Sequence, residues 1–542
     1  MSEMFCFQCA DTARGEACTV RGVCGREPEV AALHDLLLFA TVGLSQVAHR
    51  VRLSKLRDPS ADALVLRALS AGRTNALSDG PRVEDLTREA VDLRERLLRA
   101  HREVAGPAVW TPTVAATFAP AMDYHELIHQ ADVVGLGARR SMEQPEVVAA
   151  QELVIYGLRG LAAHAVQCEE VEERVLAFVH EALDALTHLR STEALAGLAR
   201  RVGERHKVVL HRHAHELARR FGEPVQTLVR TTPVRGKAIL VSGHDIAALE
   251  RVLRLADGQR VKVYTHGDLR DAHAYPALRG HVALAGHLEG AWFDQRKVFE
   301  AFPGPVLVTS DRLLRPSAQL SQRLFTTGSA GWTGVPHLDS SLAPLLAKAH
   351  ALPGYPEDQE EAFGQTGLGR AAAEDKIREV AAALRSGRLQ RVLVISGEDQ
   401  RGRKGAYYED LSARIPAGTA VIAAGSVATR LSALAERPDE ASFLDLGTLT
   451  GTAGVAGLVD LLATELRVPV SGLPLTLMLS WYGQRSVAQL LASVASQMPP
   501  RYIGPVRPAF LTPALQDTLL PGWDLRPVQQ AQADALAMFG PA

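Results

Sequence analysis

Four of the five cysteines of this chain lie within its first 24 residues, where together they could bind a metal centre. Their spacing is C-x2-C-x8-C-x5-C, and they are Cys6, Cys9, Cys18 and Cys24. Such crowding in a chain with so few other thiols is typical of metal binding rather than of a disulfide framework. Four thiolates can complete either a zinc site or a [4Fe–4S] cubane. The fifth cysteine, Cys168, stands alone in a helical pattern, and we interpret it as a small hydrophobic residue.

Histidines form two further candidate sites. His125 and His129 lie in the segment HELIH, residues 125–129, which fits the H-E-x-x-H signature of helical zinc proteases. Glu146 or Glu152 could add a third ligand, although a polar helix face that matches the pattern by accident is the favoured interpretation. A second patch, HKVVLHRHAHE, is interpreted as a solvated helix face rather than a metal site. Its histidines are His206, His211, His213 and His215.

The elements that must position these residues change type along the chain. From about residue 29 to 225 the apolar residues recur at i, i+3, i+4 and i+7, which predicts helices almost throughout. From about residue 232, short β-rich runs alternate with helical patterns, as in KAILVSGHD, VKVYTHGD, PVLVTSD, RVLVISGED, TAVIAAGS and SFLDLGT. This alternation predicts a multidomain α + α/β protein, with an N-terminal helical domain followed by two doubly wound, parallel α/β domains.

The domain boundaries follow from these changes of pattern. A chain of 542 residues is too long for a single hydrophobic core. The stretch HALPGYPEDQEEAFGQ, residues 350–365, is rich in turn-forming residues and is predicted to join the two α/β domains. We therefore expect the cysteine segment and helical domain in residues 1–228, the first α/β domain in 229–357 and the second in 358–542.

Polar residues follow the predicted strands directly. In doubly wound sheets, ligands bind at the carboxyl ends of the strands, so these residues predict a polar site between the two α/β domains. They are His244, Asp245, His266, Asp268, Asp311, Arg312, Glu398, Asp399, Ser426 and the run GTLTGTAG that begins at Gly447. The run could cradle a phosphate but lacks the lysine of a P-loop.

Composition limits the partners. The formal net charge of −2 argues against broad binding of nucleic acid or of anionic membranes, both of which require a basic face. The first residues show no signal-peptide pattern, and the longest apolar stretch, residues 36–44, is too short to span a bilayer. We therefore expect a cytoplasmic protein with no nucleic-acid or membrane partner. Composition places no constraint on the oligomeric state.

Several motifs resemble those of one known family. The start FCFQCADTARGEACTVRGVCG is similar to the N-terminus of the hybrid-cluster (prismane) proteins, the hydroxylamine reductases. Similar motifs follow in order over nearly the whole chain, among them YGLRGLAAHA, VYTHGDLRDAHAYPALRGH, AFPGPVLVTS, GLPLTLMLSWYGQ and GPVRPAFLTP. The resemblance implies a helical domain followed by two Rossmann-like domains, and a cubane on the four N-terminal cysteines. It therefore favours the cubane over zinc.

The resemblance also implies a second, hybrid iron–sulfur–oxygen cluster, but this chain departs from the expected ligands. His244 matches the family's histidine, whereas Asp268 stands where a glutamate is expected. Cysteine ligands are replaced by Arg312, Glu398, Ser426 and Leu449, while Gly483 replaces a second glutamate and Arg485 a neighbouring lysine. Leucine has no lone pair to donate, and arginine stays protonated beside cluster iron. The hybrid cluster is therefore not expected in this chain.

Three functions follow from this reading. The first is an iron–sulfur protein that keeps the cubane and acts in electron transfer, in sensing or as a partner subunit beside a redox protein; it has no assigned catalytic residue. The second is an active reductase of hydroxylamine or nitric oxide with an altered cluster, and the third is a zinc hydrolase using HELIH. In the remnant second site, we expect Arg312 to pair with Glu398 or Asp268 while Leu449 fills volume. A hard-metal site on His244, Asp268 and Glu398 is the alternative.

Overall fold

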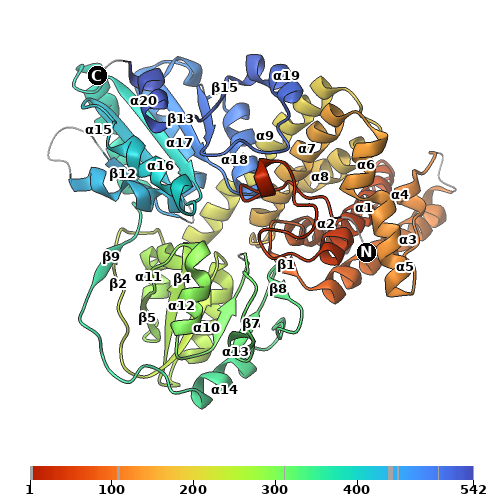
Figure 1. Cartoon of the computed structure of the whole chain (residues 1–542), viewed down its shortest axis with the longest axis horizontal. Coiled ribbons are helices and arrows are strands. Elements are labelled where there is room, and N and C mark those ends of the chain that lie inside the picture. The colour runs from red at the N-terminus through yellow and green to blue at the C-terminus, as the bar shows by residue number, and fades with distance from the viewer. Residues whose placement is uncertain are drawn as a thin grey trace.

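The computed structural model describes residues 4–106, 110–310, 312–436, 443–448, 451–498 and 500–540. Its first part is helical, as the periodicity predicts, and lies on the right of Figure 1. The helices of this part are α1 (Pro28–Arg52), α2 (Pro59–Ala71), α3 (Gly80–Ala105), α4 (Val114–Thr117), α5 (Tyr124–Val134), α6 (Leu136–Met142), α7 (Pro145–Ala165), α8 (Glu173–Ala185) and α9 (Thr192–Phe221). The cysteine segment precedes α1 and contains one short 3-10 helix, η1 (Ala13–Gly15).

Helix α1 is a core helix. By length and composition it could cross a membrane, because an 18-residue window has a mean hydropathy of 1.5, but 78% of that window is buried inside the protein. The sequence expectation considered only residues 36–44, and the apolar helix is longer than that stretch. Its apolar positions pack on α3 and α8, so burial within the helical part accounts for its composition.

The first parallel sheet has the order β5-β4-β3-β6-β7. Its strands are β3 (Lys237–Ser242), β4 (Val261–His266), β5 (Leu284–His287), β6 (Val306–Val308) and β7 (Leu324–Thr326). The elements around it are α10 (Ile246–Ala256), η2 (Gly267–Ala274), α11 (Pro276–Arg279), η3 (Trp292–Asp294), α12 (Gln295–Ala301), α13 (Ala318–Ser321) and α14 (Ala343–Ala351). Successive strands are added on opposite sides of β3, so the switch point of this sheet lies between β3 and β6.

The second parallel sheet has the order β12-β11-β10-β13-β14-β15, with its switch point between β10 and β13. Its strands are β10 (Arg391–Gly397), β11 (Thr419–Ala424), β12 (Phe443–Asp445), β13 (Leu475–Ser480), β14 (Arg501–Gly504) and β15 (Leu525–Pro527). Around it lie α15 (Arg370–Arg385), α16 (Arg403–Ser412), η4 (Ser426–Glu436), α17 (Gly451–Leu466), η5 (Val470–Gly472), α18 (Gln484–Ala495), α19 (Pro513–Trp523) and α20 (Ala531–Phe539). Two parallel sheets after a helical part confirm the predicted fold class.

The predicted connection at residues 350–365 runs between the two sheets. Its end forms β9 (Phe363–Gln365), which pairs antiparallel with β2 (Leu228–Arg230), the strand that follows the helical part. A second small pair joins β1 (Leu77–Ser78) of the helical part to β8 (Gly331–Trp332). These pairs tie the three parts of the chain together near the beginning and end of the first sheet.

Helix α18 joins the second sheet to the helical part, because it packs closely on α7 and α9. Two glycines allow this contact. A Cβ on Gly160 of α7 would lie 2.2 Å from the carbonyl oxygen of Gln484, and a Cβ on Gly203 of α9 would lie 2.1 Å from that of Leu491. Any larger residue would push the helices apart, so these two glycines fix the position of α18.

Candidate functional site

The four N-terminal cysteines lie in one small folded segment. Cys6 and Cys18 pair as an antiparallel bridge, in which each backbone N–H donates to the other's carbonyl at 3.1 and 2.8 Å. The backbone N–H of Ala13 points to the Sγ of Cys18 at 3.5 Å. Cys9 and Cys18 are buried, whereas Cys6 and Cys24 are partly exposed. The backbone thus brings together thiols that are up to 18 positions apart in sequence.

The environment of these thiols is apolar, and their charges interact. Burial raises the pKa of Cys6 to about 12, against a smaller lowering by the Arg26 guanidinium. Burial also raises the pKa of Cys9, and the negative charges of Cys24 and Cys6 raise it further. Without a metal these groups are therefore protonated thiols, and a bound metal centre would have to displace their protons.

Two kinds of metal centre could be held by four thiols. Among the described residues, no group of three or more His, Cys, Asp and Glu side chains converges on a single ion. A zinc knuckle needs four sulfurs within about 2.3 Å of one ion. A [4Fe–4S] cubane instead takes one thiolate on each of its four irons, so its ligands stand further apart. Both centres take four thiolates, and the printed contacts of the four cysteines are compatible with either.

The cysteine segment rests on the loop after β13 and on the start of α18. The backbone N–H of Ala10 donates to the carbonyl of Tyr482 at 2.8 Å, and the side chain of Gln484 donates to the carbonyl of Gln8 at 3.1 Å. The hydroxyl of Tyr482 donates to Asp11 at 3.2 Å. Figure 1 shows this red segment beside α18 in the middle of the molecule. The cysteines are therefore held against the strand ends of the second sheet.

The predicted second site lies at the switch points of both sheets. His244 follows β3 and Glu398 follows β10, the central strands at which the two strand orders reverse. Asp268 follows β4, and Arg312 lies on the loop after β6. The carboxyl ends of these strands face one another across a cavity of about 710 Å³ that is lined by Asp268, Arg312 and Glu398. The structure thus brings the remnant ligand positions together, as the sequence predicts.

Arg312 forms the predicted ion pair with Glu398. Its guanidinium also contacts two aromatic rings, 4.4 Å from the ring centre of Trp292 and 4.2 Å from that of Tyr482. Burial alone would raise the pKa of Glu398, but the charges of Arg312 and Arg485 and hydrogen bonds from Arg312 and Ser486 hold it below its ordinary value. Glu398 is therefore ionised at neutral pH, and Arg312 is its counter-ion.

Asp268 pairs with a different arginine. The Nη1 atom of Arg485 lies 2.9 Å from the Oδ2 atom of Asp268 and 3.4 Å from the Nδ1 atom of His244. Burial lowers the pKa of His244 well below its ordinary value, and the charge of Arg485 lowers it further, so His244 is neutral. The positively charged guanidinium of Arg485 thus lies where a metal would have to bridge these two side chains. The alternative was a hard-metal site on His244, Asp268 and Glu398. In the described part of the chain these side chains do not form a group that could hold a metal ion.

The expectation that Leu449 fills volume at this site stays a prediction, because that residue is not among those the structure describes. The ion pairs form part of the cavity wall, and about 710 Å³ stays open between the sheets. The physical reason is that Arg312 is drawn against Trp292 and Tyr482, and Arg485 against Asp268, so both extend along the wall. Asp311 likewise lies outside the described residues.

Three residues of this site were not found by sequence reasoning. Trp292 lies in η3 and donates to the carbonyl of Asp399 at 3.1 Å, while its ring lies 4.4 Å from that of Tyr482. Ser486 donates to Glu398 at 3.1 Å. Tyr482 is fully buried, and the charges of both Cys9 and Arg312 act on its hydroxyl, so it stands between the cysteine segment and the second site. The motif LSWYGQ was the only available signal for Tyr482.

Ser426 and Gly483 stand at two positions where the resemblance implies cluster ligands. The hydroxyl of Ser426 accepts a hydrogen bond from the backbone N–H of Asp399 at 2.9 Å, which stabilises the turn after β10. Gly483 is the N-cap of α18. Both positions therefore support the backbone of the site.

We predict that the Arg312–Glu398 pair is strongly coupled. Breaking a largely buried ion pair leaves one charge without its partner, so Arg312→Met and Glu398→Gln should each lower the free energy of unfolding by about 3 kcal/mol. The double variant should lose clearly less stability than the sum of the losses in the two single variants. The measurement is chemical denaturation followed by tryptophan fluorescence, since Trp292 reports on this site.

The matched control is Arg378→Met, because Arg378 and Asp375 form an ion pair on the exposed face of α15 with side chains 48% and 74% exposed. This substitution should change stability by no more than about 0.5 kcal/mol. Strict additivity of the Arg312 and Glu398 substitutions would show that the pair contributes nothing beyond its two separate side chains.

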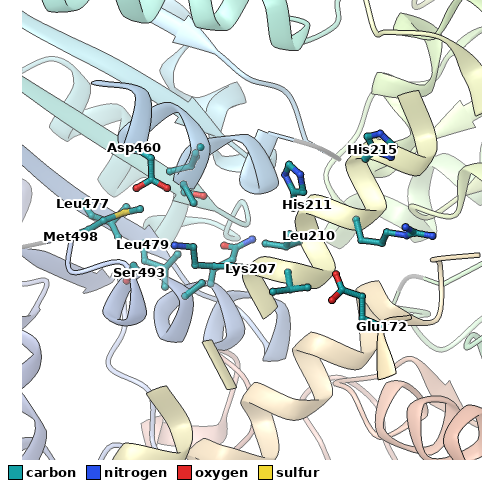
Figure 2. Close-up of a pocket in the computed structure, with 18 of the residues that line it drawn as sticks. Glu172, Lys207, Leu210, His211, His215, Asp460, Leu477, Leu479, Ser493 and Met498 are labelled. Carbon is teal, nitrogen blue, oxygen red and sulfur yellow. The ribbon is translucent and has the colours of Figure 1, made fainter. Parts of the chain in front are cut away.

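The histidine patch on α9 divides into buried and exposed residues. His206 and His213 are buried and pack against His164 of α7, with ring centres 5.1 and 6.4 Å from its ring. This corrects the interpretation of the patch as a solvated face: two of its four histidines point inward, because α9 is covered by α7 and α18. His211 and His215 line a second cavity of about 570 Å³, which Figure 2 shows.

The buried histidines predict acid sensitivity. Burial lowers the pKa of His206 and of His213 from 6.5 to about 4, so the folded protein holds both neutral. A depressed folded pKa gives a stability that is present above pH 6.5 and lost as the pH falls toward 4. Each of these two histidines should lower the free energy of unfolding by roughly 2 kcal/mol when the pH falls to about 5. Thermal unfolding between about pH 8 and pH 5 should show a steep decline that His213→Phe makes shallower, while His211→Gln leaves it unchanged.

The HELIH segment lies on α5 at the surface. His125 and His129 are both exposed, and Glu152 is buried in an ion pair with Arg139. Within the described ranges, no third ligand stands near the two histidines to complete a metal site. Glu152, one of the two candidate third ligands, is therefore engaged by Arg139 instead.

Comparison with known proteins gives a consistent result. A model of the Prismane/CO dehydrogenase family matches residues 4–536. Proteins named hydroxylamine reductase are similar over the whole length: that of Rhodospirillum rubrum is 35% identical over 99% of both chains, and that of Acidiphilium cryptum is 34% identical over 99% of both. Among solved structures, a carbon monoxide dehydrogenase from Thermococcus sp. AM4 has a TM-score of 0.55 at 13% identity, covering 98% of this chain and 89% of that one. The last similarity concerns the fold alone.

Proposed function

Since this chain belongs to the prismane/CO dehydrogenase family, we propose that it is a cytoplasmic iron–sulfur protein that keeps one [4Fe–4S] cubane, lacks the hybrid cluster and transfers electrons to or from a partner protein. One observation carries the proposal: the ion pair of Arg312 with Glu398, two positions where the resemblance implies cysteine ligands. A protonated arginine held against two aromatic rings cannot ligate iron, and its charge would repel it.

The cysteine segment supports the cubane. Four thiols, two of them buried and two partly exposed, lie in one segment, and the resemblance implies a cubane at this spacing. A thiolate-rich site of this kind requires a reducing compartment, which supports the cytoplasmic location. When bound, the cubane would supply a one-electron redox centre with a thiolate on every iron.

The chain's own residues suit electron transfer rather than turnover. The partly exposed Cys6 and Cys24 lie toward the surface, while the buried Cys9 faces Tyr482. The ring of Tyr482 contacts Trp292 and Arg312, so packed aromatic groups connect the cysteine segment with the cavity wall. An electron could enter or leave at the exposed side without a substrate reaching the cavity.

The test is anaerobic purification with iron, acid-labile sulfide and zinc quantified together. We expect about four iron and about four sulfide per chain, with a [4Fe–4S] spectrum. A clearly larger iron and sulfide load would indicate an altered second cluster and overturn the proposed loss. A colourless protein with stoichiometric zinc would overturn the cubane itself.

A further inference from the structure

The cavity in Figure 2 is separate from the site described above. It lies between α9 of the helical part and the second sheet, with α17 and α18 at its sides, and has a volume of about 570 Å³. Ligand sites in proteins commonly measure about 300 to 1,000 Å³. Among the residues that the structure describes, Gln489 alone lines both this cavity and the one between the sheets. Neither the cysteines nor the ion pairs of the second site belong to its lining.

The floor of the cavity is apolar and preformed. Leu477 and Leu479 of β13 and Met498 after α18 form it, and their side chains are 4%, 2% and 2% exposed. Leu210 of α9 and Val455 of α17 add apolar walls. An apolar ligand group placed on this floor would be removed from water, which is favourable by about 25 cal/mol per Å².

A cation extends over this floor. Lys207 lies on α9 and reaches across the cavity toward Leu479 and Ser493, with His211 one turn further along the helix (Figure 2). Lys207 forms no ion pair with any residue in the described part of the chain, although Asp460 lines the same cavity. The flanking charges are already paired, Arg212 with Glu216 at 2.6 Å and Arg174 with Glu172 at 2.5 Å. Lys207 is therefore a positive charge with which an anionic ligand could form an ion pair.

We propose that this cavity binds a medium-chain organic carboxylate. Its carboxylate would pair with the ammonium of Lys207, with His211 as a second hydrogen-bond donor, and its hydrocarbon chain would lie on Leu477, Leu479 and Met498. The bound chain would also contact α18, the helix whose first turn carries Arg485.

The experiment is isothermal titration of the full-length protein, purified anaerobically, with octanoate as the probe. We expect one site per chain. Lys207→Met keeps the length of the side chain and removes its charge, so it should weaken octanoate binding by about tenfold or more, the value of one charge-assisted hydrogen bond. Octanol, which lacks the charge, and acetate, which lacks the chain, should each bind at least about tenfold more weakly than octanoate.

Two further variants complete the design. Lys262→Met alters a half-buried lysine on β4 that lines neither cavity, and it should bind octanoate like the unaltered protein. Ala492→Leu adds volume at the cavity wall and should abolish binding. The proposal is wrong if octanoate does not bind, if octanol binds equally well, or if Lys207→Met binds as tightly as the Lys262→Met control. The comparison of octanoate with octanol needs no variant, so it decides the question even if Ala492→Leu fails to fold.

Discussion

Replacing Cys9 by alanine is expected to remove the iron–sulfur chromophore and with it most of the bound iron. Cys9 is 6% exposed, so its thiol lies inside the segment rather than at the surface. Without Cys9, only three thiolates would remain in the segment for a centre that takes one on each of its four irons. We therefore expect the iron content to fall from about four per chain to near zero. The measurements are absorbance near the cluster bands and iron and sulfide quantification under anaerobic conditions.

Cys168→Ala is the matched control, because it removes the one cysteine outside the segment. The Cys168 thiol lies beside the carbonyl of His164 at 3.6 Å, and burial raises its pKa to about 12. This variant should keep its full iron and sulfide content. Retention of the chromophore in Cys9→Ala, or its loss in Cys168→Ala, would refute the assignment of the cluster to the N-terminal segment.

The order of elements was predictable because it depends on local patterns. The helical periodicity predicted the part of the chain that holds α1 to α9, and the β-rich runs predicted β3, β4, β6, β10, β11 and β12. Strand β13 was missed, although it is the central neighbour of β10. Its sequence LTLMLS has one β-branched residue, Thr476, and no Gly directly after it. An apolar run of this length is equally compatible with a helix.

The polar part of the second site was predictable for a different reason. Residues after parallel strands must meet at one edge of the sheet, so His244, Asp268 and Glu398 could be grouped without knowing any contact. The choice of partner was not predictable in full. Arg312 could have paired with either Glu398 or Asp268. It pairs with Glu398 because Arg485 of α18 already binds Asp268.

The contact of Arg312 with Trp292 and Tyr482 could not be predicted from the sequence. Trp292 precedes α12 of the first sheet and Tyr482 follows β13 of the second, so their contact depends on how the two sheets face each other. The same is true of the buried histidines. Whether His206 or His211 points inward is decided by the closeness of α7 and α18, which rests on Gly160 and Gly203.

The last expected result is that this protein has little or no hydroxylamine reductase activity, although relatives of similar length carry that name. Reduction of hydroxylamine needs electrons and an open iron site that can bind its nitrogen or oxygen. A cubane with a thiolate on every iron has no vacant position. The loss of a metal that stabilises the transition state is worth several kcal/mol, so we expect turnover at least about a hundredfold below that of an intact relative.

The strongest counter-argument is the open cavity itself. About 710 Å³ between the sheets would accommodate a small substrate, and carboxylate or serine oxygens can ligate iron in place of thiolates. However, Glu398 is already held by Arg312 and Ser486, and the hydroxyl of Ser426 is engaged by the backbone of Asp399. Asp268 is likewise bound to Arg485. A cluster here would have to break two ion pairs and leave two arginines beside its iron, which is strongly unfavourable.

The assay supplies reduced viologen to the protein with its cluster fully loaded, and follows loss of hydroxylamine together with release of ammonia. The Rhodospirillum rubrum relative serves as the positive control and the Cys9→Ala variant as the cluster-free baseline. Arg312→Met is the informative variant: if arginine alone excluded iron, its removal would allow extra iron to bind, whereas the loss of several ligands at once predicts no gain in iron or turnover. Activity of the unaltered protein comparable to that of the relative would show that these oxygen ligands do hold a working iron centre, and that the ion pairs rearrange to admit it.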